Sequence, residues 1–168
     1  IKKMRQKLLK MAKDDKNKEY LDQIYYTLGE MDINNNDTLS AIDNYLLSTL
    51  TSVENDAQKA ISFLSLAKIE YNGARYRNAK TYYDSTIYYM EENFRLFNEA
   101  KKTHNILVYL TGHLDVINLE DSLQHLAKLP KHELNEIVNQ IIKEEKEREK
   151  EEREKQEKAY LGVFLKDL

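Results

Sequence analysis

The 168-residue sequence lacks cysteine and tryptophan and has only one proline and four glycines. The absence of cysteine excludes disulfides, thiolate-bound metals and a cysteine nucleophile, and it fits either a reducing or an oxidising compartment. Scarce proline and glycine leave little room for the many tight turns of an all-β fold. Together with 33% charged residues, this composition predicts an all-α domain with much solvated helix surface.

Charge of one sign and long apolar runs are also missing. The 26 basic and 29 acidic residues give a formal net charge of −3, which provides no strong field to attract nucleic acid or an anionic membrane. No apolar run approaches the roughly 20 residues of a membrane-spanning helix, and no signal peptide is recognisable. We expect no nucleic-acid partner and no direct membrane insertion. Because the chain opens on Ile1 in mid-helix, we also expect a piece of a longer protein.

The side chains that usually carry catalysis form no recognisable motif. The four histidines have no HExxH frame and no acidic partner at metal-ligand spacing, and His104 and His113 are nine residues apart, on opposite sides of a helix. The serines lack a GxSxG frame, and the isolated glycines build no phosphate-binding loop. We therefore predict a protein that is not an enzyme, with no catalytic residue, metal ion or cofactor.

An internal repeat of constant spacing is the strongest positive signal. Leu28 and Gly29 recur as Leu66 and Ala67, and a small residue four positions before an aromatic follows each pair. This resembles the tetratricopeptide pattern, in which small residues let two helices approach closely and the aromatic fills the space between repeats. The period exceeds the usual one of about 34 residues, and the extra residues fall in the connection at 52–56. The other pairs with the same offset are Asn34 and Asn72, Ala41 and Ala79, and Tyr45 and Tyr83.

The repeat predicts a short right-handed solenoid of tetratricopeptide helical hairpins. Each hairpin turns at a stretch rich in turn-forming residues, 34–37 and 72–75. Residues 1–17 have roughly helical apolar spacing and resemble the second helix of a truncated preceding repeat with its linker. The predicted segments are 1–17, the repeats 18–55 and 56–91, capping helices over 92–130, a helix running into a charged arm over 131–158, and an apolar tail over 159–168.

The segment after the repeats is predicted to cap the open end of the stack. We expect a long helix over 92–117, a short helix that begins at Asp121 or Ser122 and ends at Lys128, and a break at Pro130. A further helix begins near His132 and carries an apolar stripe at helical spacing, which must pack on something. The stripe comprises Leu134, Ile137, Val138, Ile141 and Ile142.

The end of the sequence is first charged and then apolar. From residue 143 to residue 158 every residue but Gln156 is charged, with oppositely charged neighbours one helical turn apart, which is typical of a solvated helical arm. The apolar patch after the arm is either a docking peptide or an ordinary loose terminus. The candidate docking residues are Tyr160, Leu161, Val163, Phe164 and Leu165.

Tyrosine is the unusual component, with 12 residues, several of them in adjacent pairs. Its apolar ring and polar hydroxyl serve both buried packing and partner contact. In the tetratricopeptide frame, the first helix of each repeat lines the concave groove, so a mixed and partly aromatic groove suited to a peptide or a helix is expected. The candidate groove residues are Gln23, Tyr26, Glu30, Ile33, Ile61, Leu64, Lys68 and Tyr71.

Five stretches carry a more specific resemblance. They are YLDQIYYTLG at 20–29, AQKAISFL at 57–64, AKTYYDST at 79–86, VINLEDSLQHLAKLP at 116–130, and the apolar segment 137–142 with the Lys/Glu arm that follows it. Together they resemble the tetratricopeptide lipoproteins of the SprE or PorW type, over about residues 15–158. The resemblance implies an outer-membrane lipoprotein that faces the periplasm, with its lipid anchor outside this chain. It also implies a role in type IX secretion and gliding motility, with translocon and motor-side proteins as partners.

Three functions of different classes are consistent with the sequence, because a fold alone does not fix a function. The leading interpretation is a non-enzymatic scaffold or adaptor in a secretion machine. The second is a glycan- or nutrient-binding helical-repeat lipoprotein, which would need a pocket with stacked aromatic rings. The third is the regulatory tetratricopeptide domain of a larger enzyme whose catalytic part lies outside this chain.

Overall fold

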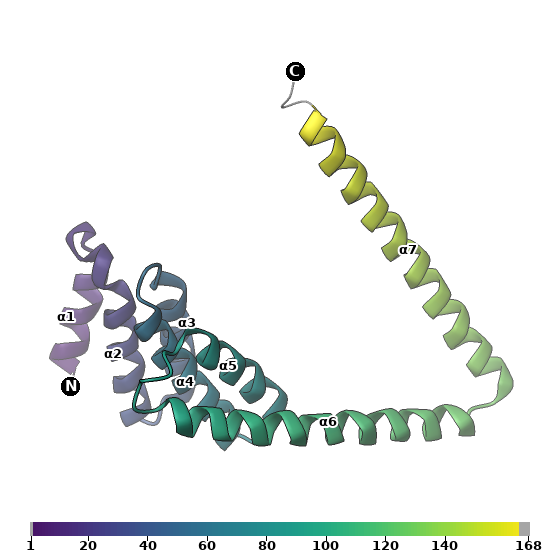
Figure 1. Ribbon diagram of the computed structural model, residues 1–168, viewed down its shortest axis with the longest axis horizontal. Coiled ribbons are helices and arrows are strands. Elements are labelled where there is room, and N and C mark those ends of the chain that lie inside the picture. The colour runs from purple at the N-terminus through teal and green to yellow at the C-terminus, as the bar shows by residue number, and fades with distance from the viewer. Residues whose placement is uncertain (1, 165–168) are drawn as a thin grey trace. The chain divides into compact units, whose positions relative to one another are not determined.

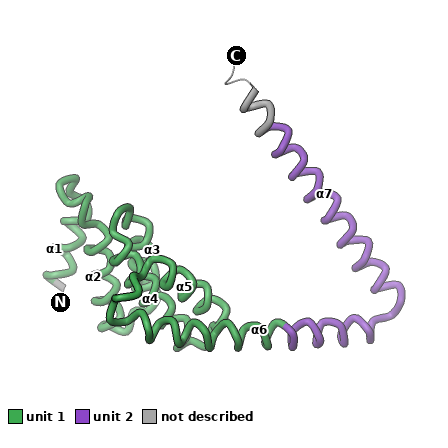
Figure 2. Tube along the Cα trace, viewed as in Figure 1, with its two compact units in different colours: residues 1–115 green, residues 116–168 purple. Residues whose placement is uncertain are grey.

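The computed structural model describes the backbone of residues 2–164 and the side chains of residues 3–158. The protein is all-α, and no strand is present between residues 2 and 164 (Figure 1). It divides into two compact units, Ile1–Asp115 (unit 1) and Val116–Leu168 (unit 2) (Figure 2). The helices are α1 (Lys2–Ala12), the 3-10 helix η1 (Asp15–Tyr20), α2 (Leu21–Asn34), α3 (Thr38–Thr51), α4 (Asp56–Asn72), α5 (Tyr76–Tyr89), α6 (Phe97–Lys128) and α7 (Lys131–Phe164).

Two helices of unit 1 begin where the sequence supplies an N-cap side chain. Asp37 accepts a hydrogen bond from the backbone N–H of Ser40 (3.1 Å) and caps α3. Asn55 caps α4 in the same way, through the N–H of Gln58 (3.2 Å). These bonds satisfy N–H groups that have no partner inside the helix. The connection between α3 and α4 is therefore a short loop with a defined end.

The helices of unit 1 pair as two hairpins, α2 with α3 and α4 with α5, and their turns share one backbone geometry. Asn36 (φ 60°) and Ala74 (φ 56°) both adopt the left-handed conformation. The N–H of the next residue, Asp37 or Arg75, donates to the carbonyl five residues earlier, at 2.9 Å in both turns. The two turns have the same offset as the sequence repeat, which is thus also a repeat of backbone structure.

Small residues allow the two helices of each hairpin to approach closely. A Cβ placed on Gly29 would lie 2.7 Å from Cε1 of Tyr45, far inside normal contact distance. Tyr45 is itself only 1% exposed, so the ring has little space into which it could move. In the second hairpin, Ala67 and Ala79 are fully buried beside Tyr83. The residues that carry the sequence repeat are therefore the ones that pack each hairpin.

Unit 1 contains two apolar clusters that join consecutive helices. One cluster joins α4, α5 and α6, and the other joins α3 and α4, so that α4 takes part in both. Because α6 contributes completely buried side chains to the first cluster, it covers the outer face of the second hairpin. The first cluster consists of Ala60, Leu64, Ala67, Ala79, Tyr83, Met90, Phe97, Ala100 and Leu107, and the second of Ala41, Tyr45 and Leu66.

A buried polar contact joins α2, α3 and α4. The hydroxyl of Ser48 lies 2.7 Å from the backbone carbonyl of Asp22 and 2.7 Å from the hydroxyl of Ser62. Both serine side chains are fully buried, and a buried hydroxyl without a partner would cost stability. The hydrogen bonds of Ser48 to Asp22 and Ser62 therefore compensate for the burial of the two hydroxyls.

Two buried carboxylates occupy equivalent positions in the hairpins and bind arginines from different places. Asp32, at the end of α2, forms an ion pair with Arg5 of α1. Glu70, at the end of α4, pairs at 2.6 Å with Arg75 from its own turn. Hydrogen bonds from Arg75 hold the pKa of Glu70 below its ordinary value. The first pair fastens α1 to the first hairpin, and the second stabilises the turn between α4 and α5.

One predicted helix boundary is wrong. The two helices expected over 92–117 and from Asp121 or Ser122 to Lys128 are a single helix, α6, which begins at Phe97. No proline or glycine interrupts the stretch around residue 120, and the hydroxyl of Ser122 donates to the carbonyl of Asn118 (2.7 Å) and does not cap a new helix. The break at Pro130 is confirmed, since α6 ends at Lys128 and α7 begins at Lys131.

Candidate partner-binding groove

The predicted groove residues lie on α2 and α4, the first helices of the two hairpins, at positions that correspond in the repeat. Gln23, Glu30 and Ile33 on α2 are exposed. Lys68 and Tyr71 on α4 are exposed as well. On each helix these positions are separated by three or four residues, or by seven, so they share one face. Five of the eight predicted side chains are therefore available to a partner.

The prediction that Leu64 lines the groove is wrong. Leu64 is only 4% exposed and packs in the cluster that α4 forms with α5 and α6. In this cluster Leu64 is enclosed together with side chains of α5 and α6, among them Tyr83 and Phe97. Ile61, one turn earlier, is half-buried. Of the four predicted residues on α4, only Lys68 and Tyr71 are therefore exposed.

Tyr26, at the position equivalent to Leu64, is half-buried between helices. Its ring lies 5.6 Å from the ring of Tyr45, tilted by 48°. The hydroxyl of Tyr45 donates to the carboxylate of Glu30. Burial raises the pKa of both tyrosines, and the neighbouring Glu30 carboxylate acts in the same direction, so both hydroxyls stay protonated. Tyr26 thus packs on Tyr45 within the first hairpin and is only partly accessible to a partner.

The exposed edge of the groove combines one charge of each sign with apolar surface. Glu30 on α2 and Lys68 on α4 occupy equivalent positions. Ile33 and Tyr71, one turn further along, are 37% and 41% exposed. The ring of Tyr71 meets the ring of Tyr76 edge to face, with 5.9 Å between centroids, which restricts its orientation. Such a surface suits a peptide or helix with both apolar and charged side chains.

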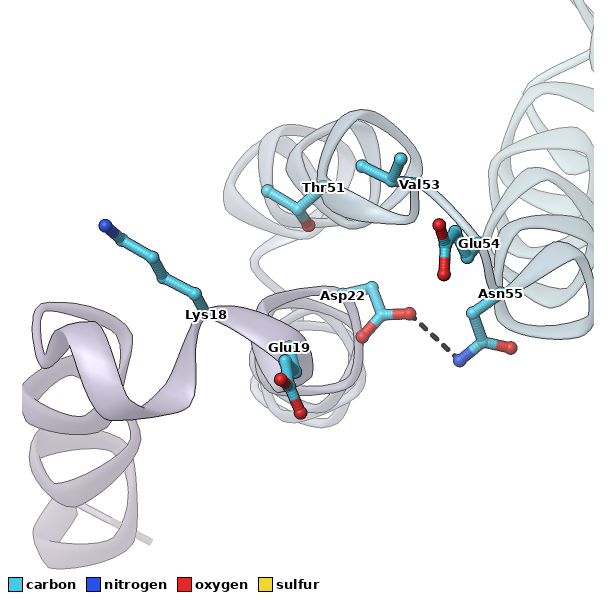
Figure 3. A pocket seen from close by; sticks show the side chains of 7 residues that line it. All are labelled: Lys18, Glu19, Asp22, Thr51, Val53, Glu54 and Asn55. Atoms are coloured by element: carbon cyan, nitrogen blue, oxygen red, sulfur yellow. Dashed lines mark hydrogen bonds between the residues drawn. The ribbon is translucent and has the colours of Figure 1, made fainter.

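A pocket that the sequence did not indicate lies at the other end of the first hairpin (Figure 3). Its volume is about 430 Å³. Asp22, at its base, is 3% exposed and accepts hydrogen bonds from Asn55 (3.0 Å) and Ser52 (3.2 Å). One feature of the sequence points to this pocket: Asp22 of the first repeat stands where the second repeat has Ala60. The lining residues are Lys18, Glu19, Asp22, Thr51, Val53, Glu54 and Asn55.

This pocket is a structural cavity with an acidic lining. Three of the lining residues are acidic and one is a lysine, so a cationic group would be favoured over an anion. The carboxylate of Asp22 already binds the loop before α4 through Asn55. Its hydrogen bonds are thus used to hold α2 against that loop.

A charged cluster connects α5 with α6. The carboxylate of Asp84 lies 2.7 Å from Nζ of Lys80 and 2.6 Å from Nε2 of His104. Partial burial acts to raise the pKa of Asp84, but the hydrogen bonds from Lys80 and His104 outweigh it and hold that pKa below its ordinary value. The cluster links two helices. Among the side chains of residues 3–158, no group of three or more histidine and acidic residues could hold a metal ion.

Stacked aromatic rings are present on α4 and α5, outside the predicted groove. Phe63 stacks on Tyr82 and on Tyr89, with centroids 6.3 and 5.9 Å apart. The ammonium of Lys59 lies 4.9 Å from the centroid of the Tyr89 ring. These rings stack on one another and do not line the pocket described above. They therefore pack α5 against α4.

The candidate docking tail, Tyr160, Leu161, Val163, Phe164 and Leu165, lies outside the residues whose side chains the structure describes. No protein-family model matches the chain, and no curated protein matches it. Within the described residues, no helix combines the length and the apolar character required to cross a membrane.

Proposed function

We propose that unit 1 is a protein-interaction module of the tetratricopeptide type, with α2–α3 and α4–α5 as two repeats and α6 as the helix that ends the stack. One observation carries this proposal: the left-handed turn, the buried carboxylate before it and the close packing of a small residue against an aromatic all recur with the offset of the sequence repeat. Repeats of this kind stack into a solenoid whose first helices present a continuous binding face.

The binding face is the groove formed by α2 and α4. Its available side chains are Gln23, Glu30, Ile33, Lys68 and Tyr71, with Tyr26 partly accessible. A peptide or helix would place apolar side chains against Ile33 and Tyr71 and a charged group beside Glu30 or Lys68. Nothing in this arrangement requires a bound metal or cofactor, and the proposed function is scaffolding without catalysis.

The cellular role that we propose is that of an adaptor in a type IX secretion and gliding machine, as in SprE/PorW-type lipoproteins. It is supported by the resemblance of residues 15–158 to that family. The adaptor would face the periplasm from the outer membrane through a lipid anchor outside this chain. Its partners would be proteins of the translocon and of the motor side.

The test compares two tyrosines in the full-length protein purified from its own membrane. Tyr71→Ala removes an exposed ring from the groove, and Tyr88→Ala removes a ring that is 81% exposed on α5. We expect translocon proteins to co-purify with the unaltered protein and with Tyr88→Ala, and to be reduced severalfold with Tyr71→Ala. Equal capture by both variants, with unchanged helical circular dichroism, would place the contact elsewhere. Normal secretion by cells that lack this module would contradict the cellular role.

A further inference from the structure

Unit 2 contains two helical segments, the end of α6 and the whole of α7, joined by a two-residue link. Both segments carry an apolar stripe. On α6 the stripe repeats after three and then four residues, as along the contact line of a coiled coil. On α7 the spacing is the same near the start of the helix. The α6 stripe comprises Val116, Leu119, Leu123 and Leu126, and the α7 stripe comprises Leu134, Ile137, Val138, Ile141 and Ile142.

The two stripes are in register about Pro130. Leu126 and Leu134 lie four residues from Pro130 on either side, Leu123 and Ile137 seven, and Leu119 and Ile141 eleven. In an antiparallel pair of helices joined by a tight turn, residues at equal distances from the turn come opposite each other. Every one of these opposed positions is apolar on both helices.

Along both stripes, the side chains nearest the link are less exposed than those further from it. Leu126 and Leu134, nearest the link, are half-buried. Leu123 (56%), Leu119 (60%) and Ile141 (57%), further away, are exposed. Apolar surface of this extent is normally covered in a soluble protein. The apolar surface is thus partly covered near the link and uncovered beyond it.

We propose that the α7 stripe docks on the α6 stripe of the same chain and that unit 2 closes as an antiparallel helical hairpin. The occupant of the exposed α6 face is thus residues 134–142 of α7. A helix of another protein would have no reason to carry apolar residues at distances that match those of the α6 stripe from Pro130. The α7 segment is tethered by two residues and must carry them at these distances to pair with α6. Tethering also gives the segment a high effective concentration at the α6 face.

The two stripes end at similar distances from Pro130. The α7 stripe ends at Ile142, where the charged arm begins, and the α6 stripe begins at Val116, fourteen residues before Pro130. The closed hairpin covers the apolar faces of both helices and leaves the charged arm in solvent.

The absence of cysteine allows a direct test on the whole 168-residue chain. The matched pair Leu123→Cys/Ile137→Cys places both thiols seven residues from Pro130. The offset pair Val116→Cys/Ile137→Cys moves one thiol along α6 by roughly 10 Å. A disulfide requires Cα atoms about 4.4–6.8 Å apart. We expect oxidation to give an intrachain disulfide in most molecules of the matched pair and at least fivefold less in the offset pair.

A second measurement does not depend on replacing stripe residues. Spin labels at Glu120→Cys and Gln140→Cys, exposed positions ten residues from Pro130, report the distance between the helices. Closed helices have axes about 8–10 Å apart, whereas an extended arrangement separates the labelled backbones by up to roughly 30 Å. In the labelled protein Leu119→Glu should shift the distances to the long range, and Asp121→Ala, on the opposite side of α6, should not.

Three outcomes would overturn the proposal. They are equal disulfide yields from the matched and offset pairs, disulfides formed only between chains, and label distances that stay in the extended range. Disulfides between chains would assign the α6 face to a second copy of the protein. Short label distances together with a selective intrachain disulfide would support closure.

Discussion

Gly29 provides the sharpest test of the packing in the first hairpin, with Gly112 as an internal control. A methyl group on Gly29 would lie 2.7 Å from Cε1 and 2.8 Å from Cδ1 of Tyr45. A methyl group on Gly112, within α6, would have no neighbour within 4 Å. Both positions are helical, so the same substitution isolates the steric effect.

The expected magnitudes follow from two opposing effects. Replacing a helical glycine by alanine stabilises by about 0.5–1 kcal/mol, because the unfolded chain loses less freedom. Forcing a methyl into a packed contact costs about 1–3 kcal/mol. Gly29→Ala should therefore destabilise by about 1 kcal/mol and by at most about 2.5 kcal/mol, while Gly112→Ala should stabilise by about 0.5–1 kcal/mol. For a chain of this size each kcal/mol shifts the melting temperature by roughly 2–4 °C.

Urea and thermal unfolding followed by far-ultraviolet circular dichroism measure both variants against the unaltered protein. A double variant, Gly29→Ala with Tyr45→Leu, removes the ring atoms that the methyl would meet. Because the methyl group then fits into the space that the ring has left, the double variant should lose less stability than the sum of the losses in the two single variants. If Gly29→Ala and Gly112→Ala raise stability equally, the close approach of α2 to Tyr45 does not exist.

Three further predictions concern the turn, the loop before α4 and the pH dependence. Ala74→Gly should stabilise by about 0.5–1 kcal/mol in urea unfolding, since alanine at φ 56° is strained. Asn55→Ala should destabilise by about 2–3 kcal/mol in the same assay, because α4 loses its cap and the buried Asp22 loses a donor. Because the pKa of Asp84 is lowered in the folded protein, its ionised carboxylate stabilises the fold above pH 3.8. This stabilisation is lost as the pH falls below that value. The melting temperature of Asp84→Asn should therefore fall less between neutral and acid pH than that of the unaltered protein.

The hairpins of unit 1 could be predicted because their determinants are local. Gly29, Ala41 and Tyr45 mark the contact between α2 and α3, and the asparagine-rich stretch before α3 marks the turn. The caps at Asp37 and Asn55 also act on residues within one turn of the helix. Short-range patterns of this kind are visible in the sequence.

The misplaced residues depend on contacts between distant segments. Leu64 stands at a position equivalent to Tyr26, and only the apolar cluster that joins α4, α5 and α6 in space shows that it is buried. The same is true of Asp22, whose burial depends on the loop at Asn55, 33 residues later. The stretch around Asp121 resembled a helix start because capping residues also occur inside helices, where the hydroxyl of Ser122 bonds to the preceding turn.

The charged arm of α7 has a mechanical consequence. Ion pairs within this single helix, such as Arg148 with Glu145 and Arg153 with Glu149, stabilise the stretch 143–158 without any packing partner. At about 1.5 Å per residue the arm spans roughly 24 Å. A flexible linker of equal length would have a similar mean span, roughly 20–24 Å, but a broad distribution of spans around it. As a helix, the arm keeps its two ends at nearly one separation, whereas a flexible linker would let that separation vary widely.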